Sequence, residues 1–303
     1  MDEKESKRNK LYDLLGKLPN RSSGISTDKI YQVERECYVL EKLVLDLNGI
    51  ENVPAYFVRP HNINGPLPTI LYNHAHGMNY ALGKDELLLG RSSLQPVPYA
   101  EALTSNGYAA LCFDAWGFGE RSGRTESEIF KEMLWTGRVM WGMMIYDSIR
   151  AIDYLVSRSD VDQDRIGTIG ISMGSSMAWW LAALDTRIKV CIDICCLTDF
   201  QMLIETKSLD EHGIYYYVPD LLNHFTTAQI NSLIVPRPHL SLAGNNDPLT
   251  PPAGLDRINS ELIDNYRMEN SSDAWNLKRY ETGHFETSDM RTEIFSFFNK
   301  WLR

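Results

Sequence analysis

The chain has 303 residues, of which 44% are hydrophobic and 23% charged, a composition typical of a globular protein. Its formal net charge of −10 argues against nucleic-acid binding, because phosphate contacts need clustered Lys and Arg, and against docking on an anionic membrane. No run of 18 apolar residues and no apolar leader is visible, so we expect neither a membrane span nor a signal peptide.

The pattern over residues 1–35 predicts a helical and then looped extension, and that over residues 36–303 predicts a single domain. Within that domain, β-branched or apolar runs predict strands at 41–47, 53–60, 68–74, 108–115, 165–170, 188–196, 237–244 and 274–281. Helical patterns separate most of them, which predicts an α/β fold: a mostly parallel eight-stranded sheet flanked by helices. Residues 125–146 and 199–232 exceed this minimal pattern and are expected to form helical, cap-like insertions.

The five cysteines are an odd number without a CxxC pair: Cys37, Cys112, Cys191, Cys195 and Cys196. Four of them lie in apolar, strand-like contexts. This pattern favours reduced, buried thiols and a cytoplasmic protein over a disulfide framework or a zinc site.

One serine stands between two glycines where a predicted strand becomes a predicted helix. The segment 170–174 reads Gly-Ile-Ser-Met-Gly, with Ser172 at its centre. G-x-S-x-G in a strand–turn–helix context is the pattern of a nucleophile elbow. The alternative is a turn closed by a helix-capping serine.

A serine hydroxyl is a weak nucleophile, so this interpretation requires a base and an acid later in the chain. Asp247 follows the strand predicted at 237–244, and His284 follows the last predicted strand. The order Ser, Asp, His after successive strands predicts a catalytic triad of Ser172, Asp247 and His284. Asp199, after the preceding strand, is the competing acid.

Four motifs of the chain together resemble those of a known superfamily. The elbow, the acid loop "AGNNDPLTP", the histidine loop "GHF" and the turn "FDAWGFGERSG" resemble the α/β-hydrolase superfamily over about residues 40 to 303. The chain is most similar to the group of dienelactone hydrolases, acetyl xylan esterases and prolyl-oligopeptidase-like enzymes. The resemblance implies an α/β-hydrolase fold and serine-hydrolase chemistry without a cofactor.

Acyl transfer also needs backbone N–H donors for the oxyanion, and the residue after the nucleophile, Met173, is expected to supply one. By resemblance to acetyl xylan esterases, the second is His76 in the loop after residues 68–74, with Gly77 as the near alternative. His74 and His76 also raise the alternative of a metal site. We expect no metal, because the sequence offers no third ligand in a recognisable motif.

Aromatic residues in the two insertions are candidates for the substrate pocket, namely Trp135, Trp141 and Tyr216. The competing interpretation is that they form core or oligomer contacts, as aromatic stripes usually do. The sequence establishes no anion clamp, and Arg121 and Arg138 are candidates for one only by their position in the chain.

Together these patterns predict a serine esterase that cleaves a small-molecule ester, such as an acetylated sugar or a lactone. Peptidase, thioesterase or acyltransferase chemistry could use the same triad, and a non-catalytic binding protein could use the same fold. A homodimer is compatible with the sequence.

Overall fold

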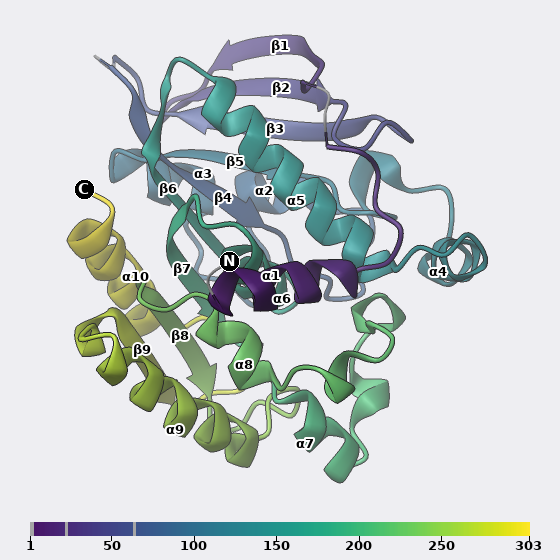
Figure 1. Ribbon diagram of the computed structural model, residues 1–303. Helices are drawn as coiled ribbons and strands as arrows, with labels where there is room; N and C mark the ends of the chain where they lie inside the picture. Colours follow the sequence, from purple (N-terminus) through teal and green to yellow (C-terminus); the bar gives the residue numbers. More distant parts are fainter. Residues whose placement is uncertain (1–2, 22–23, 63–64) are drawn as a thin grey trace.

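A twisted sheet runs through the molecule in the order β1-β2-β3-β5-β4-β6-β7-β8-β9 (Figure 1). The computed structural model describes residues 3–21, 24–62 and 65–303, so residues 1–2 and 22–23 of the predicted extension lie outside it. The strands are β1 (Thr27–Glu34), β2 (Val39–Leu45), β3 (Val53–Arg59), β4 (Leu67–Asn73), β5 (Ala109–Phe113), β6 (Val161–Ile171), β7 (Ile188–Ile194), β8 (His239–Gly244) and β9 (Trp275–Tyr280). Neighbouring strands from β5 to β9 pair in parallel, whereas β1, β2 and β3 pair antiparallel.

The helices cover both faces of the sheet. They are α1 (Glu3–Asp13), α2 (Glu86–Leu89), α3 (Tyr99–Ser105), α4 (Glu126–Trp135), α5 (Met140–Ser157), α6 (Met173–Leu184), α7 (Phe200–Glu205), α8 (Thr227–Ser232), α9 (Pro252–Met268) and α10 (Ser288–Trp301). Residues of α5, α6 and α9 belong to one apolar core, and residues of α3 and α10 to the other. Along β4, Leu71 joins the first core and Ile70 and Tyr72 the second, so this strand is buried on both faces, as its continuous apolar run predicts.

The predicted extension contains a ninth strand, so the expectation of helix and loop alone over residues 1–35 is wrong. β1 pairs antiparallel with β2 at the edge of the sheet. Seven of its eight residues are exposed, including Ile30, Tyr31 and Val33. Because neither face of β1 is buried, its sequence carries no alternation of apolar and polar residues that would reveal a strand.

The two predicted insertions differ in character. The first contains α4, which Figure 1 shows projecting at the right-hand edge, and then the start of α5. Residues 140–146 are buried in the core against the sheet, so this part of the predicted insertion is an ordinary sheet-covering helix. The second contains α7, three short 3₁₀ turns and α8, and its turn η4 (Ile214–Tyr216) contacts α4.

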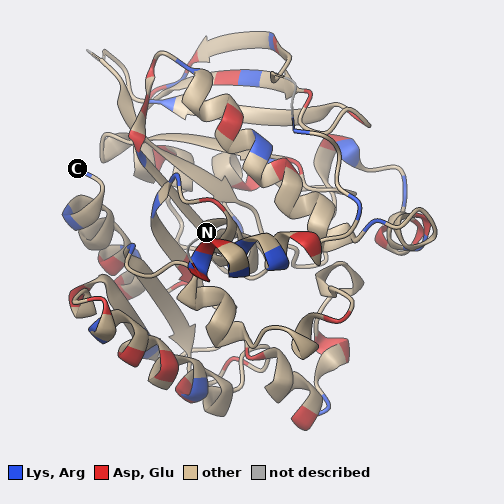
Figure 2. Cartoon of the chain, in the orientation of Figure 1, with Lys and Arg blue, Asp and Glu red and all other residues tan. Residues whose placement is uncertain are grey.

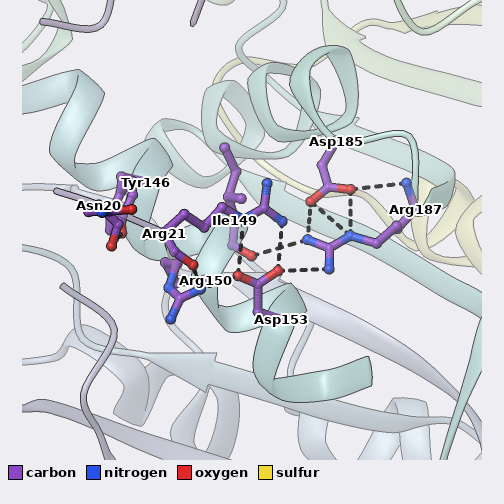
Figure 3. Close-up of polar contacts among 8 residues, drawn as sticks. All are labelled: Asn20, Arg21, Tyr146, Ile149, Arg150, Asp153, Asp185 and Arg187. Carbon is purple, nitrogen blue, oxygen red and sulfur yellow. Dashed lines mark hydrogen bonds and ion pairs between the residues drawn. The ribbon is translucent and has the colours of Figure 1, made fainter. Parts of the chain in front are cut away.

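Charged side chains anchor the N-terminal segment to the body of the protein (Figure 3). The Asp153 carboxylate on α5 accepts hydrogen bonds from Arg21 at 2.6 and 3.1 Å and from Arg150 at 2.5 Å, and pairs with Arg187 at 2.8 Å. Partial burial alone would raise the pKa of Asp153, but the hydrogen bonds from Arg21 and Arg187 lower it overall. The segment after α1 is therefore fixed by a shared carboxylate as well as by apolar contacts.

Charge is otherwise spread over the surface. Figure 2 shows acidic and basic positions interspersed along α9 and α10, whereas the central strands carry few of either. In the described ranges, no helix combines the length and the apolar character needed to cross a bilayer.

Candidate active site

Ser172 occupies a sharp turn between β6 and α6. Its backbone has φ 60° and ψ −123°, a conformation that is costly for a residue with a side chain. Its N–H donates to the Ile194 carbonyl at the end of β7, at 3.0 Å. The side chain is partly exposed while the surrounding turn is buried, which is the geometry of a nucleophile elbow.

The two glycines of the motif allow close backbone contacts. A Cβ on Gly174 would lie 2.0 Å from the Asn73 carbonyl oxygen, and a Cβ on Gly170 would lie 2.4 Å from the backbone of Gly174. Any larger residue at either position would push α6 away from β4. The spacing of the motif thus follows from how tightly the elbow packs.

Asp247 and His284 meet at the carboxyl edge of the sheet, in the loops after β8 and β9. His284 Nδ1–H donates to Asp247 Oδ2 at 2.8 Å, and the other carboxylate oxygen, Oδ1, accepts the Leu249 N–H at 3.0 Å. The Asp247 side chain is fully buried, which strengthens its hydrogen bond to the imidazole.

The Nε2 atom of His284 is buried and makes no hydrogen bond to any described residue, Ser172 included. Catalytic hydrogen bonds are often long or misaligned in unliganded enzymes and tighten only around substrate. Nε2, the ring nitrogen that faces away from Asp247, is thus not hydrogen-bonded to any described protein group.

The competing acid, Asp199, has a different role. Its Oδ1 accepts the Met202 N–H at the start of α7, and the carboxylate pairs with Arg257 at 3.5 Å. The structure therefore pairs His284 with Asp247 and leaves Asp199 as a helix cap.

The predicted oxyanion donors lie in two backbone segments, the start of α6 and the loop after β4. The chain leading into that loop packs against the elbow, because a Cβ on Gly174 would lie 2.0 Å from the Asn73 carbonyl oxygen and 3.0 Å from that of His74. Met173 begins α6, so its N–H has no partner within the helix. In the loop after β4, the Ala75 N–H is used by the Glu86 carboxylate at 3.2 Å. The N–H groups of His76 and Gly77 donate to no residue that the structure describes. Both therefore stay available as the second donor.

His74 and His76 form protein contacts through both ring nitrogens. His74 Nε2 accepts the Ala115 N–H at 3.0 Å and its Nδ1 lies 3.0 Å from the Ala75 carbonyl. Burial lowers the pKa of His74 to about 4. Its neutral ring therefore connects the segment after β5 to the loop after β4, called here the oxyanion loop because the predicted donors His76 and Gly77 lie in it.

A group of potential metal ligands does occur around the Asp247–His284 pair. Cys195 Sγ and the ligand atoms of Asp247 and His284 all lie within 4.8 Å of one another. Burial raises the pKa of the Cys195 thiol, which therefore fills space beside the pair as a neutral group.

The predicted pocket residues lie in three different environments. The prediction that Trp135 lines a pocket is wrong, because its side chain is 93% exposed at the end of α4. Trp141 is fully buried in the core, with its ring centroid 5.8 Å from that of Tyr215. Tyr216 stacks on His212 at 5.0 Å and lines a cavity of about 280 Å³ whose described walls come from residues 200–223, without the triad.

Of the two anion-clamp candidates, Arg121 is not placed for that role. Arg121 donates to the Asp114 carbonyl and to Asp147 at 2.8 and 2.9 Å, and its side chain is 1% exposed. It is therefore a buried structural residue. The backbone of Arg138 forms an isolated antiparallel β-bridge with that of Gly16.

Comparison with known proteins agrees with this geometry. Residues 49–234 match the model of the S15 family, described as X-Pro dipeptidyl-peptidase. The chain is 54% identical over 296 residues to the Bacillus subtilis (strain 168) protein named "Putative hydrolase YtaP", covering 98% of this chain and 99% of that protein.

Solved structures share the fold at low identity. A glucuronoyl esterase from Solibacter usitatus has a TM-score of 0.68 at 16% identity, covering 96% of this chain and 91% of the other. An acetyl xylan esterase from Paenibacillus sp. R4 has a TM-score of 0.63 at 18% identity, covering 99% and 92%. The chain therefore belongs to the S15 (X-Pro dipeptidyl-peptidase) family and is a hydrolase with the α/β-hydrolase fold.

Proposed function

We propose that this protein is a serine carboxylesterase that cleaves small esters through an acyl-enzyme formed on Ser172. The observation that supports this most strongly is the 2.8 Å bond from His284 Nδ1 to the buried Asp247, combined with the strained elbow that presents Ser172. These are the three components that acyl transfer by a serine requires.

In the proposed reaction, the Ser172 oxygen attacks the ester carbonyl carbon while His284 Nε2 takes the hydroxyl proton. Asp247 holds the imidazole with its proton on Nδ1 and stabilises the imidazolium. The N–H of Met173, with that of His76 or Gly77, stabilises the negative oxygen of the tetrahedral intermediate. Collapse expels the alcohol, which takes the proton from His284, and water then releases the acid by the same steps in reverse.

We propose a short acyl group, such as acetyl, as the substrate class. Several structural neighbours are named as acetyl xylan esterases. Bulky aromatic side chains around the oxyanion loop favour the same choice, because Tyr215 stacks on His76 at 5.1 Å. Close packing of this kind favours a small acyl group over a long chain.

The test is a series of p-nitrophenyl esters from acetate to octanoate, measured with wild type, Ser172→Ala and Ser176→Ala. Ser176 is the matched control, because it lies one turn further along α6 and donates to the Cys196 carbonyl. We expect turnover in wild type and Ser176→Ala, highest for acetate, and only background rates in Ser172→Ala. Equal rates in all three proteins would overturn the proposal.

A peptidase is the second candidate, favoured by the family match to X-Pro dipeptidyl-peptidases. The same triad could open a peptide bond after proline. An Xaa-Pro p-nitroanilide assayed beside p-nitrophenyl acetate separates the two. A higher kcat/KM for the anilide would replace the esterase proposal with the peptidase.

We also propose that the protein works in the reducing cytoplasm. All five cysteines are free and four of them are buried, which suits a compartment that keeps thiols reduced. Thiol titration of denatured protein from cells lysed under an alkylating agent should find five alkylated cysteines. A disulfide in that sample would contradict the proposal.

A further inference from the structure

His76 connects the oxyanion loop to the first insertion through both of its ring nitrogens. Its Nδ1 accepts the backbone N–H of Met78 at 3.1 Å, and its Nε2 lies 2.7 Å from Glu126 Oε2. Because Nδ1 is an acceptor here, the proton must be on Nε2, which donates to the carboxylate. The contact with Glu126 thus fixes which tautomer the ring adopts.

The ring is also held by aromatic neighbours. Tyr215 of η4 stacks on it at 5.1 Å with an interplanar angle of 19°, and Tyr80 and Phe118 meet it edge-on at 5.1 and 5.2 Å. These contacts hold the plane of the ring, but they do not select a tautomer. Two described contacts of His76 select the same tautomer: the Met78 N–H donates to Nδ1, and Glu126 is the side chain that accepts the proton on Nε2.

The tautomer of His76 affects the backbone segment that carries the candidate oxyanion donors. Gly77 and Met78 have φ values of 50° and 54°, so the loop turns sharply directly after His76. This conformation is costly for Met78 and persists only where surrounding contacts determine it. The hydrogen bond from the Met78 N–H to the ring is such a contact, and it exists only while Nδ1 is unprotonated.

We propose that Glu126 is a positioning residue for the oxyanion hole, an inference that rests on the esterase function proposed above. Glu126 is the first residue of α4 and is separated from His76 by 50 residues of chain. It fixes the tautomer of His76, the ring then fixes the Met78 N–H, and the turn directs the N–H groups of His76 and Gly77 toward the oxyanion. Glu126 itself touches no reacting atom.

The test uses Glu126→Ala and Glu126→Gln, with Glu132→Ala as the matched control. Glu132 lies on the same helix but is exposed and pairs with Arg124. Each enzyme is titrated with a fluorophosphonate, so that kcat is expressed per reactive serine, and Tm is recorded beside it.

For Glu126→Ala we expect kcat on p-nitrophenyl acetate to fall about ten- to hundredfold, which is no more than the fall in kcat caused by removing one oxyanion donor outright. KM should change less than threefold. Glu126→Gln should recover kcat to within threefold of wild type, because its amide oxygen can still accept from Nε2–H. Binding of a boronic acid, which mimics the tetrahedral intermediate, should weaken in parallel with kcat. A merely structural role would lower Tm and the titratable fraction while leaving kcat per serine unchanged.

An unchanged kcat per serine in Glu126→Ala would overturn the inference, and so would a Gln variant as impaired as the Ala variant. If Glu126→Ala does not fold, Glu126→Asp replaces it, because it keeps the charge but withdraws the carboxylate by one methylene. Its kcat should fall severalfold, and an unchanged value would overturn the inference equally. Absence of turnover in wild type would instead refute the esterase function itself.

Discussion

We predict that replacing Asp247 by Asn, which changes one atom of the proposed triad to an NH2 group, causes a large loss of activity without loss of fold. The Leu249 N–H needs an acceptor at 3.0 Å, so the Asn oxygen takes the place of Oδ1 and its NH2 group faces His284. His284 Nδ1, now opposite a donor at the former 2.8 Å contact, must become an acceptor. The ring proton then moves to Nε2, where it blocks proton abstraction from Ser172.

A triad with this wrong tautomer loses roughly 10⁴ in kcat, which corresponds to about 5.5 kcal/mol of transition-state stabilisation. The assay is kcat on p-nitrophenyl acetate for Asp247→Asn beside Asp199→Asn, the same substitution at the helix-capping acid. We expect Asp199→Asn to keep kcat within threefold and both variants to show cooperative melting. A kcat within tenfold of wild type for Asp247→Asn would refute the assignment of Asp247 as the triad acid.

Three further changes test the packing around the site. Gly174→Ala places a Cβ 2.0 Å from the Asn73 carbonyl and should cost about 2 kcal/mol or more of stability, measured as a lower Tm. Gly24→Ala has open space and should melt like wild type, so equal Tm shifts would contradict the steric explanation. Burial lowers the pKa of His74 from 6.5 in the unfolded chain to about 4 in the folded protein, so the unfolded state binds the proton first as the pH drops. The free energy of unfolding should therefore fall by up to about 3 kcal/mol between these two pH values. Urea titrations should show a shallower pH dependence for His74→Gln, and an unchanged slope would be evidence against this linkage. Cys195→Ala should keep kcat within threefold, because burial raises the pKa of this thiol, which therefore stays protonated and acts neither as a base nor as a nucleophile. A loss above tenfold would assign it a larger role.

The sequence predicted those features that local chemistry determines. Ser172 could be located because its strand, turn, helix and two glycines are contiguous. The contact between Asp247 and His284 could be predicted because parallel strands bring their following loops to one edge of the sheet. The burial of β4 followed from its continuous apolar run.

What the sequence did not predict depends on contacts between distant segments. β1 has almost no buried residue, so no periodicity marked it as a strand. The pairing of Glu126 with His76 spans 50 residues and belongs to no motif. The exposure of Trp135 could not be predicted from residue type alone, because an aromatic residue in a helical insertion can be almost fully exposed.

The esterase mechanism is tested most directly by intact mass after reaction with a fluorophosphonate, followed by peptide mapping of the modified residue. Wild type should gain one adduct, on Ser172, and Ser172→Ala should gain none while melting at a similar temperature. Peptide mapping that places the adduct on another residue, or a wild-type mass that does not change, would contradict the assignment of Ser172 as the nucleophile.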